Sequence, residues 1–71
     1  MEKIDVRGLS CPLPVIKVKK AIDNGAVEVQ VLGNSNVSRE NVSKLLNSQG
    51  FSLDLTRSDH EGWELEARKN Q

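Results

Sequence analysis

Two prolines, Pro12 and Pro14, constrain how this 71-residue chain can fold, because they separate a strand pattern from a helical one. Before them, Ile4 and Val6 alternate with polar residues, as in a short half-buried strand, and Gly8 ends the alternation. Proline lacks an N–H, so a helix accepts it in the first turn, where the amides have no intrahelical acceptor. The prolines therefore predict that a strand ends near Gly8 and that a helix begins at Pro12.

The spacing of apolar residues after Pro12 is helical. Val15, Val18 and Ile22 lie at positions i, i+3 and i+7 and predict the buried face of this helix. The dipeptide Asn24-Gly25 follows, and both residue types tolerate the left-handed backbone that ends many helices. We therefore expect the first helix to span the stretch from Pro12 to the residues just before this dipeptide.

The rest of the chain repeats the alternation of strand and helix signals. Alternating apolar residues predict strands over 27–31, 51–55 and 63–67, and Val42, Leu45 and Leu46 predict the face of a second helix. The polar segment 58–62 is a predicted turn, so the last two strands form a hairpin. The order is β-α-β-α-β-β. Right-handed crossovers would place both helices on one face of a four-stranded mixed sheet, an α/β (α+β) two-layer sandwich.

The other face of the predicted sheet is left uncovered, and it is polar and rather acidic. The alternation places on it the side chains of Glu28, Gln30, Ser52, Asp54, Thr56, Glu64 and Glu66. The sequence has no repeat, no low-complexity tract and no sign of a second domain, so we expect residues 1–71 to form one domain.

The size and charge of the chain argue against several functional classes. Lys and Arg number 10, as do Asp and Glu, and this zero net charge disfavours nucleic-acid binding, which depends on neutralising phosphates. No segment resembles a signal peptide or is apolar for long enough to cross a bilayer, so no membrane partner is expected. With one Trp, one Phe and no Tyr, the core is too small for an enclosed cavity. Any chemistry must therefore take place at the surface or against a partner.

Cys11 is the only cysteine, and it directly precedes Pro12. A single thiol forms no internal disulfide and cannot by itself hold a four-ligand zinc site, and a free thiol favours the reducing cytoplasm. If Cys11 is the N-cap of the first helix, the free amides of Leu13 and Val15 and the positive end of the helix dipole face its thiolate. The alternative is an inert thiol buried against Val15 or Val18.

Four basic residues, Arg7, Lys17, Lys19 and Lys20, form a candidate patch beside the thiol. Such a patch would help to hold a thiolate or would dock an acidic partner, with Lys17 and Lys20 as the candidate docking residues. The alternative is that the lysines are simply the solvated face of a helix.

Three further residues have a plain structural interpretation. Asp5 is expected to pair with Arg7 or Lys3, or only to occupy a strand, and Trp63 to pack in the core or the hairpin. His60 could form a nucleophile pair with the cysteine, but its polar turn favours a solvated loop histidine. There is no phosphate-binding loop and no cluster of His and Cys, so no metal or cofactor is expected.

The segment Asp5-Val6-Arg7-Gly8-Leu9-Ser10-Cys11-Pro12-Leu13-Pro14-Val15, followed by Lys17 and Lys20, resembles the signature of the TusA/SirA/YedF sulfur-carrier family. The resemblance covers essentially the whole chain and implies that Cys11 is the residue that bears a persulfide. The supporting motif that it implies consists of Arg7, Gly8, Pro12 and Pro14. The glycine would allow a tight approach of the loop, and the prolines would stiffen it.

The resemblance also implies two protein partners, a sulfur donor of the cysteine desulfurase type and a sulfur acceptor. The acceptors of the family belong to tRNA thiolation, molybdenum cofactor, sulfur oxidation or selenium pathways. Residues 40–43 and 48–51 look closest to the YedF-type domain linked to selenium metabolism. Asn34-Ser35 departs from TusA proper, which has an acidic pair there, and this weakens the implied role in tRNA thiolation.

Two functions from different classes follow from the sequence. The first is a cytoplasmic sulfur carrier that accepts sulfane sulfur on Cys11, a sulfurtransferase-type carrier rather than a stand-alone metabolic enzyme. The second is a non-catalytic protein-binding or regulatory domain that uses its open sheet face and in which the cysteine is incidental.

Overall fold

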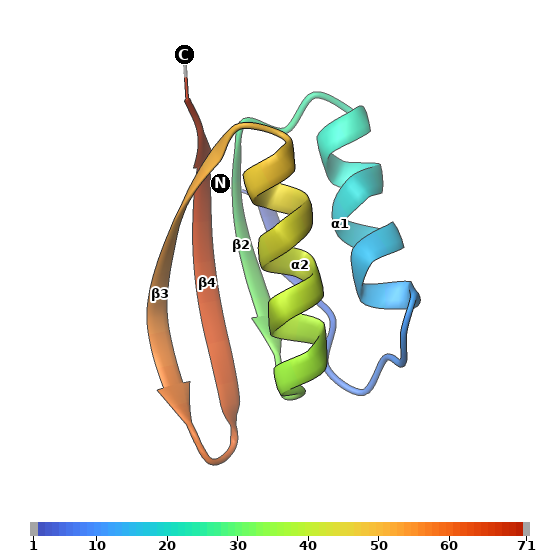
Figure 1. Cartoon of the computed structure of the whole chain (residues 1–71), viewed down its shortest axis with the longest axis vertical. Coiled ribbons are helices and arrows are strands. Elements are labelled where there is room, and N and C mark those ends of the chain that lie inside the picture. Colours follow the sequence, from blue (N-terminus) through green and yellow to red (C-terminus); the bar gives the residue numbers. More distant parts are fainter. Residues whose placement is uncertain (1, 71) are drawn as a thin grey trace.

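A four-stranded sheet with both helices on one of its faces is the architecture of the chain (Figure 1). The structure is a computed structural model that describes residues 2–70. The elements are β1 (Glu2–Asp5), α1 (Leu13–Asp23), β2 (Glu28–Gly33), α2 (Asn36–Ser48), β3 (Phe51–Asp59) and β4 (Gly62–Lys69). The predicted order and the two-layer α+β sandwich are confirmed.

The sheet is mixed, with the strand order β1-β2-β4-β3. β1 and β2 are parallel, and α1 is the crossover that two parallel neighbours require. β4 is antiparallel to both β2 and β3. The hairpin predicted from the last two strands is therefore present, and β4 lies inside the sheet between β2 and β3, where its alternating apolar residues are buried.

The core lies between the sheet and the two helices. It is formed by aliphatic side chains and two aromatic ones: Ile4, Val6, Val18, Ala21, Val29, Val31, Val42, Leu46, Phe51, Trp63, Leu65 and Ala67. The face of α2 is buried at Val42 and Leu46, as predicted, with Leu45 partly buried. The core position predicted for Trp63 is confirmed.

The buried face of α1 differs from the predicted one. Pro14, Val18 and Ala21 are buried, whereas Val15 and Ile22 are only half-buried. At both ends of the buried face, the buried residue therefore lies one position earlier in the chain than the one predicted. The rotation of α1 against the sheet turns Pro14 toward the core, and its apolar ring, with no N–H to satisfy, can be buried there.

The β3–β4 hairpin is longer and its turn is tighter than predicted. Asp59 pairs with Gly62, so only His60 and Glu61 lie between the strands. The Asp59 carboxylate accepts hydrogen bonds from the amides of Glu61 (2.9 Å) and Gly62 (3.2 Å), as aspartate does in tight turns. Leu55 is predicted on the apolar face of β3 but is 44% exposed. Burial on this face decreases along the strand, from Phe51, which is buried, through Leu53, which is half-buried, to Leu55.

The sheet face opposite the helices is uncovered, as predicted (Figure 1). The register places Gln30, Glu66 and Asp54 side by side across three strands, with Lys3 next to Gln30 on β1. Arg68 lies between Glu28 and Ser52 in the same way. The face is therefore mixed in charge. Within residues 2–70, neither helix has the length and apolar character needed to cross a membrane.

Candidate functional site around Cys11

Cys11 lies in the loop between β1 and α1, and its thiol is free and exposed to solvent. The alternative in which the thiol is buried against Val15 or Val18 is therefore wrong. The predicted N-cap position of Cys11 is wrong as well, since Pro12 is the N-cap and α1 begins at Leu13. The amide of Leu13 donates to the Ser10 carbonyl (2.9 Å), so this amide is not available to the thiol.

The two prolines lie in the first turn of the helix without removing a helical hydrogen bond. The carbonyl of Pro12 accepts from the amide of Ile16 (3.1 Å), which closes the first turn. Pro14 is the second helical residue, and its ring is buried against the core. Cys11 is therefore attached directly to a rigid helix start on its C-terminal side.

An ion pair closes the bend that follows β1. The guanidinium of Arg7 donates to Asp5 through Nε (3.0 Å) and Nη2 (2.8 Å), and the Arg7 amide donates to the same carboxylate (3.0 Å). These bonds, the side-chain ones first, hold the pKa of Asp5 well below its ordinary value and raise the pKa of Arg7. Asp5 thus pairs with Arg7, the first of its two predicted partners.

A glycine is favoured at position 8 because of the backbone conformation there. Its φ is +74°, in the left-handed region that side chains disfavour, and an added Cβ would meet nothing within 4 Å. The reason that the family resemblance implied for this glycine, a tight approach of the loop, is therefore wrong, and the glycine is needed for its positive φ. Its amide donates to Oδ1 of Asn34 (3.2 Å), which lies 26 residues further along the chain.

Asn34 also belongs to this site, although the sequence singled it out only as part of the Asn34-Ser35 departure from TusA proper. It lies between β2 and α2, and its side chain connects this segment to the loop that carries Cys11. The two loops lie at the same end of the molecule (Figure 1). The only local signal was a polar residue directly before a helix cap, which says nothing about a partner so far away in the sequence.

Trp63 holds the segment that contains Asn34 in place. Its indole Nε1 donates to the carbonyl of Ser35 (2.9 Å), and a Cβ on Gly33 would overlap its ring. Ser35 also caps α2, since its hydroxyl accepts from the amide of Ser38 (3.3 Å). The buried core therefore extends through this segment to Asn34 and on to Gly8.

Two of the four basic residues predicted to form a patch, Arg7 and Lys19, have acidic partners. Arg7 is paired with Asp5, and Lys19 is paired with Asp23 one turn away (3.1 Å). Lys17 donates through Nζ to the backbone carbonyl of Asp5 (2.9 Å). Within residues 2–70, Lys20 forms no ion pair. Lys17 and Lys20 line one shallow hollow together with Leu9, Leu13 and Ile16.

His60 is not a partner of the thiol. It lies at the tip of the β3–β4 hairpin, its side chain is 92% exposed, and the group it approaches is the carboxylate of Glu61 (4.0 Å). Among the described residues, no group of three His, Cys, Asp or Glu side chains is placed to hold a metal ion.

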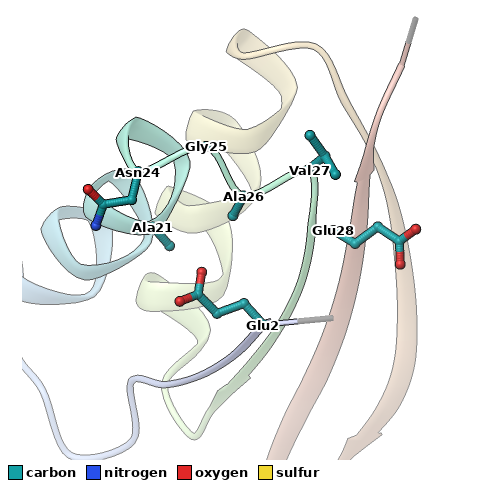
Figure 2. A pocket seen from close by; sticks show the side chains of 7 residues that line it. All are labelled: Glu2, Ala21, Asn24, Gly25, Ala26, Val27 and Glu28. Carbon is teal, nitrogen blue, oxygen red and sulfur yellow. The ribbon is translucent and has the colours of Figure 1, made fainter.

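A hollow of about 540 Å³ lies away from Cys11 (Figure 2). It is at the opposite end of α1, where Ala21 lies near Glu2, and Asn24 and Gly25 also line it. It is wide open, and Val27 and Glu28 at its edge point away from it (Figure 2). Cys11 is not among the residues that line this hollow.

Comparison with known proteins identifies the family. The sequence profile of the sulfurtransferase TusA matches residues 2–69. A protein of Methanocaldococcus jannaschii, described as a candidate sulfur carrier, is 31% identical over 97% of this chain and 95% of its own length. The crystal structure of the SirA-like protein from Desulfitobacterium hafniense superposes with a TM-score of 0.83 at 31% identity, over 100% of both chains. The chain belongs to the TusA sulfurtransferase family.

Proposed function

We propose that this protein is a sulfur carrier that accepts a sulfane sulfur on Cys11 and passes it to a partner protein. The observation that supports this most is the exposed lone thiol on a loop fixed at both ends, by Pro12 and Pro14 on one side and by Arg7 and Gly8 on the other. Family membership and the description of the archaeal relative support the same role.

The proposed chemistry is a transfer between two thiols with no net oxidation. The Cys11 thiol gives its proton to water, and the thiolate attacks the terminal sulfur of a donor persulfide. A new bond forms between Sγ of Cys11 and this sulfur, while the S–S bond of the donor breaks. The donor leaves as a thiolate and takes up a proton. Delivery to the acceptor is the same step with Cys11 as the leaving group.

The absence of a second cysteine defines the role as that of a carrier. Cys11 is the only cysteine of the chain, so no internal thiol can attack the persulfide and release its sulfur. The sulfur would then stay on Cys11 until an external thiol or substrate reaches it. An exposed position is what such an encounter requires.

The proposal also covers the location, the partners and the pathway of the carrier. The chain acts as one TusA-like domain in the cytoplasm, between a donor of the cysteine desulfurase type and a protein acceptor. The segments 40–43 and 48–51 support a YedF-type role in selenium metabolism, and Asn34-Ser35 weakens a role in tRNA thiolation. Lys17 and Lys20 contribute to docking of the partners, and the Cys-Pro-x-Pro segment supplies the reactive loop.

Incubation with a cysteine desulfurase and cysteine, followed by intact-mass measurement, tests this function. The wild type should gain one sulfur, about 32 Da, which a reductant removes, as expected of a persulfide. The Cys11→Ser variant should fold normally and gain nothing. An unchanged wild-type mass, also after treatment with glutathione persulfide, would contradict the carrier function and favour a binding domain with an incidental cysteine.

A further inference from the structure

The outer edge of β3 has no partner strand. β3 lies at one end of the strand order β1-β2-β4-β3, so among the described elements only β4 pairs with it (Figure 1). With nine residues it is the longest strand of this sheet, whereas β1, at the other end, has four. The N–H and C=O groups along an unpaired edge can hydrogen-bond to a further strand. β3 is therefore where the sheet offers most backbone to such a strand.

Two hydrogen bonds at the open end of the β3–β4 hairpin fix the direction of the backbone groups. The amide of Asn70 donates to the carbonyl of Gly50 across the hairpin (2.8 Å). The amide of Lys69, which lies opposite Phe51, donates instead to the carbonyl of Val27 on the other side of β4 (2.8 Å). Inward and outward positions alternate along an antiparallel strand. The backbone groups of Phe51 therefore point away from β4, toward the unpaired edge.

The same alternation gives β3 three residues whose N–H and C=O groups point toward the unpaired edge: Phe51, Leu53 and Leu55. Their side chains lie on the face that the helices cover, and this cover decreases until Leu55 is 44% exposed. The regular ladder ends at a bulge between Leu55 and Arg57, and bulges of this kind terminate strand pairing. An added strand therefore pairs with the segment 51–55, which we call the β3 edge.

The side chains beside the β3 edge determine which strand fits it. On the helix side, Leu53 and Leu55 provide an apolar surface that apolar side chains of an added strand would cover. On the open face, Asp54 lies directly opposite Glu66 of β4, and like charges in this position destabilise a sheet. Within residues 2–70, neither carboxylate forms an ion pair.

The charge on the open face beside the β3 edge is negative. A hollow of about 310 Å³ is lined here by the carboxylates of Asp54 and Glu66 and by one cation, Arg68, together with Ser52 and Leu53. A lysine or arginine side chain of an added strand would lie next to Asp54 and would compensate the second carboxylate. Because side chains alternate between the two faces of a strand, the basic residues of the added strand alternate with its apolar ones.

We infer that the β3 edge binds an extended segment of a partner protein in which apolar and basic residues alternate. In such strand addition the main-chain hydrogen bonds provide affinity, and the alternate side chains provide specificity. β3 and β1 are the two opposite edges of the sheet, and Cys11 follows β1. The bound segment therefore leaves the thiol accessible, and the inference does not depend on the proposed function.

A second copy of this chain fits the β3 edge poorly. Two such edges paired with each other would bring the Asp54 and Glu66 carboxylates of both copies together, and like charges on neighbouring strands oppose pairing. Nucleic acids and anionic membranes carry the same sign of charge and are disfavoured for the same reason. A partner with basic side chains is the occupant that the charge of this edge selects.

The test is an NMR titration of the full, ¹⁵N-labelled chain with a synthetic peptide of alternating valine and lysine, blocked at both ends. We expect amide shifts confined to β3 and β4, and slower amide hydrogen exchange at Leu53 and Leu55, whose N–H groups acquire acceptors. A peptide of alternating valine and glutamate should bind at least about tenfold more weakly, because its charges repel Asp54. A third peptide, methylated on the amide nitrogen of every valine, keeps the charges but loses the donors that face β3, and it should not bind.

A pair of matched variants tests the charge. Asp54→Lys should weaken binding of the valine–lysine peptide by about tenfold, and the loss should shrink as the salt concentration rises. Glu40 is an exposed carboxylate on α2, away from β3, so Glu40→Lys makes the same reversal of charge and should bind like the wild type. The amide spectra of both variants show that they are folded.

The outcomes that would overturn the inference are distinct. The first is a wild-type spectrum that the valine–lysine peptide leaves unchanged. The second is equal binding of the methylated and unmethylated peptides, or of Asp54→Lys and the wild type, which would mean that strand addition beside Asp54 does not occur. Amide shifts centred on the Cys11 loop would place the peptide there instead. A dimer in solution joined through residues 51–55 would assign the β3 edge to a second copy. None of these results bears on the sulfur loading of Cys11, which tests the proposed function separately.

Discussion

The side chain of Asn34 accepts a hydrogen bond from the amide of Gly8 (3.2 Å), and this bond joins the Cys11 loop to the segment between β2 and α2. The segment is itself fixed to the core, since the indole of Trp63 donates to the carbonyl of Ser35. The loop that carries the thiol is therefore braced from three directions: by Asn34, by the Asp5–Arg7 pair and by the start of α1.

Removing the acceptor at position 34 should loosen the loop. Asn34→Ala leaves the Gly8 amide to water and should cost about 1 kcal/mol, the usual net value of one hydrogen bond. Amide hydrogen exchange at Gly8 should then accelerate by roughly fivefold. Asn34→Asp keeps an acceptor oxygen and should retain most of the protection. Equal exchange rates at Gly8 in the wild type and Asn34→Ala would show that the bond does not hold the loop.

A side chain at position 8 should be costly because of backbone conformation alone. Gly8 has φ +74° and open space around it, so Gly8→Ala introduces strain without a clash. The expected loss of stability is about 1 kcal/mol, measured by urea denaturation. Gly8→Asn should lose less, because asparagine tolerates the left-handed region better than alanine. If alanine and asparagine cost the same, conformational strain is not the reason for the glycine.

A side chain at position 33 should be costly because of a steric clash rather than backbone strain. A Cβ on Gly33 would overlap the ring of Trp63, so Gly33→Ala overpacks the core and should destabilise the fold by about 1–3 kcal/mol. In a Trp63→Leu background the same change should cost much less, because the ring is gone. The double-mutant cycle of these two changes measures the coupling directly, and strictly additive costs would contradict the overlap.

The Asp5–Arg7 pair should make stability depend on pH in the acid range. The pKa of Asp5 in the folded chain lies below its unfolded value of about 3.9, so the unfolded chain binds the proton at higher pH. The contribution of the pair is therefore complete above about pH 5 and is lost as the pH falls through 4 toward the folded pKa. Its size is limited, since both side chains are about half exposed.

Thermal denaturation between pH 2 and pH 6 checks this dependence. Wild type and Asp5→Asn should differ most at pH 6, and their curves should converge as the pH falls. Asp59, whose pKa is lowered mainly by the amide of Glu61 and also by Arg57, contributes in both proteins and cancels in the comparison. Parallel curves over the whole range would mean that the pair does not contribute to stability.

The element order and the place of the thiol follow from local patterns in the sequence. Alternation marks β2 and β4, whose inward residues are buried on one face only, and the prolines mark the start of α1. The exposure of Cys11 could be predicted for the same reason, since a proline-rich corner between a strand and a helix lies at the surface.

Contacts between distant residues could not be predicted in this way. The bond between Asn34 and Gly8 and that between Lys17 and the carbonyl of Asp5 depend on which ends of the elements meet in space. The burial of Pro14 in place of Val15 depends on how α1 rotates against the sheet. No periodicity within one element contains this information, because it is set by tertiary packing.

The central claim is that Cys11 holds a sulfur atom that did not originate in the chain and releases it to another thiol. The most direct measurement loads the protein from ³⁵S-cysteine with a cysteine desulfurase, removes the donor by gel filtration and then adds dithiothreitol. We predict that the label stays with the wild type through the filtration, leaves completely with the thiol and never appears on Cys11→Ser. Label on Cys11→Ser, or label that dithiothreitol does not release, would contradict the account.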